Sequence, residues 1–288
     1  MIGSEMTGIV YLNGNYCNAS DAKISIFDRG FLFADSVYEV IPVYNGHPFY
    51  FSKHLERLTY SLKNARIIPP NLDWQSLLNT LIAKNGGGDM QVYLQITRGN
   101  EGIRKHDIPS QIEPTVIAFT IHTPYPTLEE KKRGLHAKLI EDIRWLRCDI
   151  KTTALLGNIL LNDDAVSSGA DTAILARDGF LTEGGAANLF LVDVNGVIRT
   201  PPLNHLCLSG ITRQIAIELI NQLSWPLREE KIPASAIFKA QEVWITSTTK
   251  EIFPITRIND TSIGNGYGGA YWSQINTRYQ QLIKAQYD

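Results

Sequence analysis

Segments with strand-like and helix-like patterns alternate along the whole chain, on both sides of one proline-containing stretch. Apolar residues at every second position predict half-buried strands, and apolar residues spaced by three and four predict helices. Residues 122–133 carry Pro124, Pro126 and then a run of charged residues, which is typical of a stiff connector. We therefore predict an α+β fold of two domains, with an N-terminal α/β domain over residues 1–121, a linker over 122–133 and a C-terminal domain over 134–288.

The N-terminal half predicts strands and two helices. Strand patterns cover residues 8–13, 37–43, 92–96 and 116–121. One helix is expected after Ser52, and a second is capped by Asp73 and ended by three consecutive glycines at 86–88.

The C-terminal half predicts further strands at 135–140 and 243–246, a helix that begins near Ile211 and a last helix through 275–283. Asp178-Gly179 and Asn195-Gly196 predict two tight hairpins. A helix is also expected over 154–168. Its predicted inner side is Leu155, Leu156, Ile159, Leu160 and Val166.

Composition limits the classes of partner. The 288 residues carry a net charge of −2 with no basic block, so we expect no nucleic-acid partner. Apolar runs such as 115–121 are too short to span a bilayer, and residues 1–11 lack the pattern of a secretory signal, so we expect no membrane partner. Three widely spaced cysteines, Cys17, Cys148 and Cys207, predict neither a disulfide framework nor a zinc site and favour a cytoplasmic location.

Four segments could carry chemistry, although each pattern alone is more typical of ordinary structure. Lys151 precedes an apolar helix, and partial burial would make its amine a nucleophile, but a lone lysine is more often exposed or paired. Gly210 could let the N-terminus of the following helix bind an anion, or could be a plain helix entry. Residues 247–249 could bind a phosphate or form a polar loop, and Glu183 could be a solvated turn carboxylate.

Taken together and in order, several blocks are similar to one known family. They are Asp28-Arg29-Gly30, DSVYEV at 35–40, HLERL at 54–58, EDIRWLRCDIK at 141–151, LSGITR at 208–213 and TSTT at 246–249. The chain resembles the fold-type IV pyridoxal-phosphate enzymes, and among them the D-amino-acid (D-alanine) aminotransferases, from about Val10 to about Arg257. The resemblance implies pyridoxal 5′-phosphate as the cofactor.

The resemblance also implies roles for single residues. Lys151 would hold the cofactor as a Schiff base and carry a proton during the reaction. Glu183 would face the pyridine nitrogen and keep it protonated, and Leu208 would pack against the ring. The phosphate would be bound by Arg57, Ile211, Thr212, Ser247 and Thr248.

Most of the residues that the resemblance assigns to substrate binding lie on one loop. Arg104 and His106, together with Tyr38, would bind the substrate carboxylate, whereas the role of Arg98 stays open between binding and structure. In this family the loop, here 98–106, reaches the partner subunit's site, which implies a homodimer. Residues 100–103 make the loop about one residue longer than the family pattern, and Gly185-Ala186-Ala187 replaces a more serine-rich stretch.

The function that the resemblance implies is transamination between small D-amino acids and 2-oxo acids such as 2-oxoglutarate or pyruvate. Branched-chain L-amino-acid aminotransferases share the fold and the cofactor residues and are one alternative. A lyase similar to 4-amino-4-deoxychorismate lyase is another. A structural homologue without catalysis is disfavoured because both Lys151 and Glu183 are present.

Overall fold

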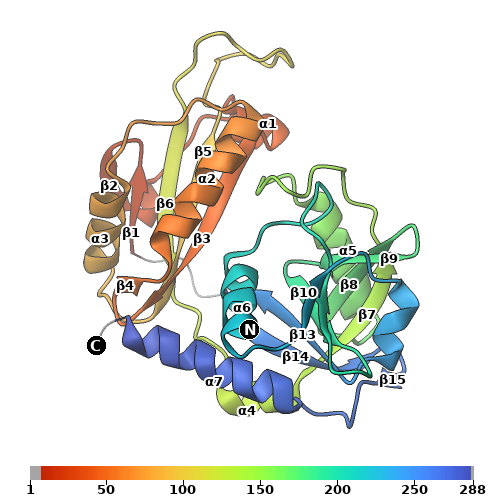
Figure 1. Ribbon diagram of the computed structural model, residues 1–288. Coiled ribbons are helices and arrows are strands. Elements are labelled where there is room, and N and C mark those ends of the chain that lie inside the picture. The colour runs from red at the N-terminus through yellow and green to blue at the C-terminus, as the bar shows by residue number, and fades with distance from the viewer. Residues whose placement is uncertain (1–7, 287–288) are drawn as a thin grey trace. The chain divides into compact units, whose positions relative to one another are not determined.

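A computed structural model describes residues 8–286 (Figure 1). Residues 1–7, at the start of the segment considered for a secretory signal, lie outside the described part, as do 287–288. The chain forms two compact units. The first comprises the described part of Met1–Pro124 together with Ile150–Ala154, and the second comprises Tyr125–Asp149 and Leu155–Gln286.

Residues 122–133 differ from the stiff connector that we expected. Leu128–Arg133 form a helix, α4, whose first turn is closed by a capping box between Thr127 and Glu130. Lys131 of this helix is buried and forms an ion pair with Glu251 of the second unit. Residues 125–133 therefore belong to the second unit, and the buried Lys131 fixes them to β14 (Glu251–Ile258) through its ion pair.

The first unit contains a six-stranded sheet in the order β2-β1-β6-β5-β3-β4. β3 pairs antiparallel with β5 along its length, from Ser36 opposite Thr97 to Val43 opposite Met90. The strands are β1 (Ile9–Leu12), β2 (Asn15–Asn18), β3 (Ser36–Tyr44), β4 (His47–Pro48), β5 (Met90–Thr97) and β6 (Thr115–Ile121). The helices are η1 (Ala19–Asp21), α1 (Arg29–Phe33), α2 (Phe51–Ala65) and α3 (Trp74–Lys84). Asp73 caps α3 as predicted, accepting from the N–H of Ser76.

Helices α2 and α3 pack on one face of this sheet (Figure 1). Side chains alternate along a strand, so the odd-numbered residues of β3, such as Val37 and Ile41, face the helices. The even-numbered Tyr38 lies on the opposite face, where its ring stacks on Tyr93, which in turn stacks on Phe119. β3 therefore carries an apolar core on one face and a row of aromatic rings on the other.

The second unit contains a nine-stranded sheet in the order β12-β11-β10-β13-β14-β7-β8-β9, with β15 paired to β14. The strands are β7 (Leu135–Glu141), β8 (Thr172–Arg177), β9 (Phe180–Gly184), β10 (Asn188–Val192), β11 (Ile198–Thr200), β12 (Leu227–Glu229), β13 (Glu242–Ser247), β14 (Glu251–Ile258) and β15 (Thr261–Ser262). The helices, besides α4, are α5 (Leu156–Ser167), α6 (Ile211–Gln222), η2 (Ala234–Lys239) and α7 (Ala270–Ala285). Both predicted hairpins are present, β8 with β9 and β10 with β11.

The prediction for α5 was partly wrong. The helix begins at Leu156, and the preceding residues Ile150–Ala154 belong to the first unit, although we had placed them in the C-terminal domain. Its buried residues are Leu161 and Ala165. The side predicted to face inward is largely exposed, with Leu156, Ile159, Leu160 and Val166 all on the surface of the single chain. Periodicity identified an apolar side of the helix, but the structure buries that side only in part.

None of the helices in the described residues is long and apolar enough to cross a membrane.

Candidate active site

Lys151 lies in the short segment Ile150–Ala154, which belongs to the first unit although the residues on either side of it belong to the second. Its carbonyl accepts from the N–H of Tyr38 at 2.9 Å, its own N–H donates to Ser61 Oγ at 3.2 Å, and Thr152 forms a bridge with Val37. The half-buried side chain places Nζ 4.2 Å from the centre of the Tyr38 ring. β3 and α2 thus fix the lysine backbone, and its amine lies on the aromatic face of the sheet.

Arg57 and His54 of α2 both contact Glu39, a carboxylate inside the apolar core. Arg57 Nε and Nη2 each donate to a different oxygen of Glu39 at 2.7 Å, and His54 Nδ1 lies 2.8 Å from Oε2. Such a two-point contact fixes the plane of the guanidinium. Burial lowers the pKa of His54, so the imidazole stays neutral at pH 7.

Because of the Glu39 carboxylate, we expect the free energy of unfolding to depend on pH in the acid range. Burial alone would raise its pKa, but the charge and hydrogen bonds of Arg57, with the hydrogen bond of His54, lower the pKa from 4.5 to about 2. The resulting stabilisation is complete above pH 4.5 and is lost as the pH falls through 2, because the unfolded chain then binds the proton first.

We expect Glu39→Gln to lower the free energy of unfolding at neutral pH and to make its fall with acidification shallower than in the wild type, since glutamine does not titrate. Urea unfolding between about pH 6 and pH 3 measures both effects. Glu56→Gln is the control, because Glu56 precedes Arg57 on α2 but forms only an exposed pair with Lys53. Equal pH dependence in Glu39→Gln and the wild type would contradict the assignment.

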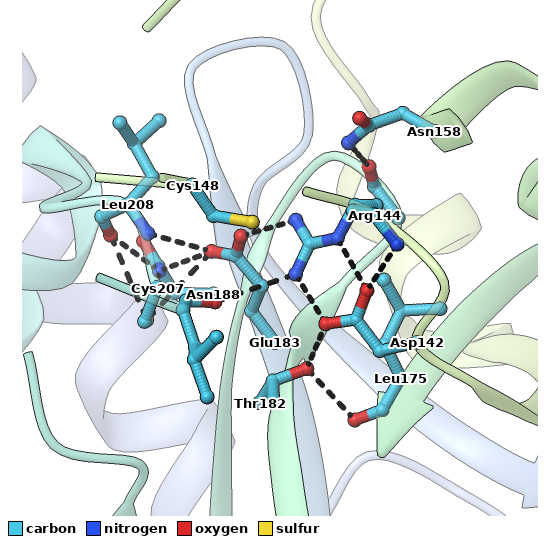
Figure 2. A network of polar contacts seen from close by, with 12 residues as sticks. Asp142, Arg144, Cys148, Asn158, Leu175, Thr182, Glu183, Asn188, Cys207 and Leu208 are labelled. Atoms are coloured by element: carbon cyan, nitrogen blue, oxygen red, sulfur yellow. Dashed lines mark hydrogen bonds and ion pairs between the residues drawn. The ribbon is translucent and has the colours of Figure 1, made fainter. Parts of the chain in front are cut away.

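Glu183 is the centre of a polar cluster in the second unit (Figure 2). Its Oε1 accepts from Arg144 Nη1 at 2.5 Å. Its Oε2 accepts from the N–H of Leu208 and from Asn188 Nδ2, both at 3.1 Å. The residue is buried at the end of β9, not solvated in a turn. Donors from β10 and from the segments after β7 and before α6 therefore hold this carboxylate, and one of them is the Arg144 cation.

Arg144 connects Glu183 to a second carboxylate, Asp142. Figure 2 shows the guanidinium between the two carboxylates. Nε and Nη2 of Arg144 donate to Asp142 at 2.9 and 2.8 Å, and Asp142 also accepts from Thr182 Oγ1 and Arg177 Nη2. Burial favours the neutral forms, yet these contacts raise the pKa of Arg144 and lower that of Asp142. Both groups are therefore charged in the folded protein.

The Glu183 carboxyl is harder to ionise than usual. Its burial raises the pKa, while Arg144 and the Leu208 amide oppose that rise. Burial also raises the pKa of the neighbouring Cys207 thiol, so this sulfur stays protonated. A group that binds next to Glu183 and brings a positive charge would stabilise its carboxylate form.

The segments proposed to bind phosphate lie at the start of α6 and after β13. Gly210 precedes α6 and offers no side chain to cap the N–H groups of its first turn, where Ile211 and Thr212 are buried. A Cβ at Gly210 would lie 2.0 Å from Asn188 Oδ1, so only glycine fits beside that amide. Ser247 and Thr248 are half-buried, and Ser247 Oγ accepts from the N–H of Lys250.

Thr246, which immediately precedes Ser247 and Thr248 in the chain, is also relevant to the proposed phosphate site. It lies directly opposite Asn188 in the β10–β13 pair, so both side chains are on one side of the sheet. Its buried Oγ1 has no hydrogen-bond partner within residues 8–286. Since buried polar atoms are nearly always paired, this hydroxyl fits a site for a polar ligand.

The residues expected to bind a substrate carboxylate lie in the first unit. Arg104 and His106 are exposed on the loop between β5 and β6, and Tyr38 is half-buried on β3. Arg98 is instead buried: Nε and Nη2 donate to Asp35 at 2.7 and 2.9 Å. Of the alternatives for Arg98, these contacts favour the structural one.

Comparison with known proteins identifies the family. The model of class IV amino-transferases matches residues 36–258. The chain belongs to the class IV aminotransferases. It is 36% identical to the D-alanine aminotransferase of Staphylococcus epidermidis and 37% identical to that of Bacillus licheniformis, each over 96% of this chain and 98% of the relative.

Solved structures of this family have the same fold. The branched-chain amino acid aminotransferase of Escherichia coli superposes with a TM-score of 0.89 at 25% identity, over 96% of this chain and 95% of that one. The branched-chain aminotransferase of the archaeon Thermoproteus uzoniensis, solved with norvaline, gives a TM-score of 0.87 at 24% identity, over 98% and 96%. The resemblance to the fold-type IV enzymes and the predicted fold class are therefore confirmed.

Three polar residues of the site escaped the sequence analysis. Glu39, Asp142 and Arg144 were all inside the similar blocks but received no role. A signal existed for Glu39, because a carboxylate at a core-facing position of an apolar strand requires a buried partner. Arg144 carried no such signal, since two charged residues two positions apart are common in exposed segments.

Proposed function

We propose that this aminotransferase transfers the amino group of small D-amino acids, with D-alanine as the reference substrate, to 2-oxo acids such as 2-oxoglutarate or pyruvate. The observation that carries the proposal is the similarity to D-alanine aminotransferases at 36 and 37% identity over nearly the full length. The carboxylate-binding residues of the family pattern, Tyr38, Arg104 and His106, are present in this chain.

The cofactor of this family is pyridoxal 5′-phosphate, and the residues present fit it. A pyridine nitrogen requires a carboxylate such as Glu183, and a phosphate requires N–H groups and a cation. We propose that Ile211, Thr212, Ser247, Thr248 and Arg57 bind the phosphate, and that Leu208 packs against the ring. The unpaired hydroxyl of Thr246 and the uncapped start of α6 support this assignment.

When bound, the cofactor supplies an electron sink for the bonds of the substrate's α-carbon. Lys151 Nζ would hold the cofactor covalently, and as a free amine it would accept and return the proton of the substrate's α-carbon. Glu183, oriented by Arg144, would face the pyridine nitrogen and favour its protonated form. Arg57, whose guanidinium plane is fixed by Glu39, would balance the charge of the phosphate.

Reaction with each enantiomer tests the substrate. We expect D-alanine to convert the coloured holoenzyme to its amino form at least about 100-fold faster than L-alanine, because Arg104 and His106 bind the carboxylate from one side only. Single-turnover absorbance measures the rate. Faster conversion by L-leucine would favour the branched-chain alternative, and pyruvate release without an amino acceptor would favour a lyase.

We propose that the enzyme is a homodimer in which the 98–106 loop reaches the partner's site. α5 supports this, because Leu156, Ile159 and Leu160 lie three and four residues apart on one exposed side. Nearby in sequence, Ile143 and Leu146 are also 64% and 60% exposed. A second copy of the chain would cover these residues, and Arg104 and His106 would then contact a site other than that of their own chain.

Leu160→Asp is expected to shift the protein from dimer to monomer, since a carboxylate cannot be buried in an apolar interface without a partner. Analytical ultracentrifugation measures the change. Val194→Asp serves as the control, because Val194 is 67% exposed and lies next to the hairpin turn at 195–196. A dimeric Leu160→Asp variant would place the interface elsewhere.

We also propose a cytoplasmic location. All three cysteines are free thiols, and Cys148 and Cys207 are buried, which is compatible with a reducing compartment.

A further inference from the structure

Arg29 has no part in the function proposed above, yet it is almost completely buried at the start of the five-residue helix α1. Its guanidinium donates to three successive peptide carbonyls. Nη1 contacts the oxygens of Lys105 at 2.6 Å and Asp107 at 3.2 Å, and Nη2 contacts that of His106 at 3.3 Å. Nη1 also lies 3.3 Å from Glu101 Oε2.

These carbonyls belong to the loop that carries Arg104 and His106. The loop connects β5 to β6 and has no regular secondary structure between residues 101 and 114. Peptide carbonyls outside ladders and helices need other donors or water to be satisfied. One side chain thus binds three successive carbonyls of the loop, while the side chains of Arg104 and His106 remain exposed.

Arg29 is itself fixed from the other side. Its Nε donates to Asp35 Oδ2 at 2.9 Å, and Asp35 also accepts two hydrogen bonds from the buried Arg98. Asp28 caps α1 at the N–H of Gly30 and accepts from Thr115 Oγ1 at 2.7 Å. The orientation of the guanidinium is therefore set by the ends of β3, β5 and β6 before any ligand binds.

Phe33, at the end of α1, adds a contact with the two exposed side chains. The Arg29 guanidinium lies 5.0 Å from the centre of the Phe33 ring and that of Arg104 lies 5.3 Å from it. The ring of His106 lies 5.3 Å from that of Phe33. Cations and aromatic rings attract each other at such distances. Helix α1 therefore contacts both the backbone and the side chains of this loop.

We propose that Arg29 is a positioning residue for substrate binding, which holds the loop so that Arg104 and His106 are already arranged to bind a carboxylate. The inference rests on the function proposed above. A preorganised loop does not lose conformational freedom when substrate binds, so the effect of Arg29 is on affinity for carboxylate substrates.

Kinetics of the full-length holoenzyme with D-alanine test the proposal. We expect Arg29→Gln to raise KM at least about 10-fold while kcat changes less than about threefold, and Arg29→Lys to recover only part of KM, since an ammonium cannot reach all these acceptors at once. In an Arg104→Gln background, Arg29→Gln should raise KM less than about twofold further, because both substitutions remove the same interaction.

Hydrogen exchange gives a readout that does not depend on the substrate. In Arg29→Gln, the amides of residues 100–107 should exchange faster, while β3, β5 and β6 exchange at wild-type rates and the absorption of the bound cofactor is unchanged. Lys131→Gln is the matched control, because it removes another buried cation, paired with Glu251, and should lower stability without changing KM.

The outcomes separate the two proposals. If Arg29→Gln raised KM by the same factor with and without Arg104→Gln, or if residues 100–107 exchanged at wild-type rates, the role of Arg29 would be refuted. The proposed carboxylate site would not be affected by either result. An unchanged KM for D-alanine in Arg104→Gln would refute the carboxylate site itself, and with it the purpose assigned to Arg29, whereas the exchange data would still show whether Arg29 holds the loop.

Discussion

Lys151→Ala is expected to lose the visible absorption of the lysine-bound cofactor and at least about 10³-fold in kcat, because one amine provides both the covalent link and the proton transfer. Lys151 is half-buried, and its replacement by alanine removes no contact of its backbone with Tyr38 or Ser61. We therefore expect the variant to fold with nearly wild-type stability. Absorbance spectroscopy and single-turnover kinetics measure the two losses.

Lys138→Ala provides the matched control for this prediction. Lys138 is a lysine of β7 whose amine donates to the carbonyl of Asp164 in a long contact of 3.4 Å. Its replacement should change neither the spectrum nor kcat. Substantial turnover by Lys151→Ala, measured on protein free of wild-type enzyme, would refute the role assigned to Lys151.

Arg144→Met is expected to lower the free energy of unfolding by about 3–5 kcal/mol, the usual effect of removing one partner from a buried ion pair. The substitution leaves Glu183 buried with only neutral donors and removes two of the hydrogen bonds that Asp142 accepts from side chains. The pKa of Glu183, already raised by burial, would rise further without this cation. Urea unfolding measures the change in stability.

Arg147→Met is the control for Arg144→Met, because the two arginines form similar ion pairs but differ in burial. Arg147 pairs with Asp149 two residues later, as Arg144 pairs with Asp142 two residues earlier, but its side chain is 43% exposed. We expect a loss of less than about 1 kcal/mol. Adding Glu183→Gln to Arg144→Met should recover part of the stability, because the unpaired charge is then absent. If Arg144→Met and Arg147→Met lowered the free energy of unfolding equally, the buried cluster would contribute no special stability to the second unit.

Local patterns predicted most of the secondary structure. The cap at Asp73 and the hairpins at 178–179 and 195–196 depend on neighbouring residues only, and the structure contains them all. The family and its cofactor also followed from short blocks whose order is specific. These features were predictable because the physical cause and the pattern lie in the same stretch of chain.

Long-range pairing was not predictable in this way. Arg29 contacts residues more than 70 positions away, and Glu183 contacts Arg144 at a separation of 39. Nothing in the local sequence of an arginine specifies such a partner. α5 shows the same limit, since its apolar side was recognisable in the sequence but its exposure in the single chain was not. The roles of the site residues remain predictions for the experiments above.

The five residues Ile150–Ala154 leave the second unit and return to it after pairing with β3. Neither unit is therefore made from one uninterrupted stretch of polypeptide. A fragment that starts at Tyr125 would contain Lys151 but not the strand and helix that hydrogen-bond to its backbone. Expression of the halves separately, or exchange of one half with that of a relative, must consequently carry this insertion with the strand that receives it.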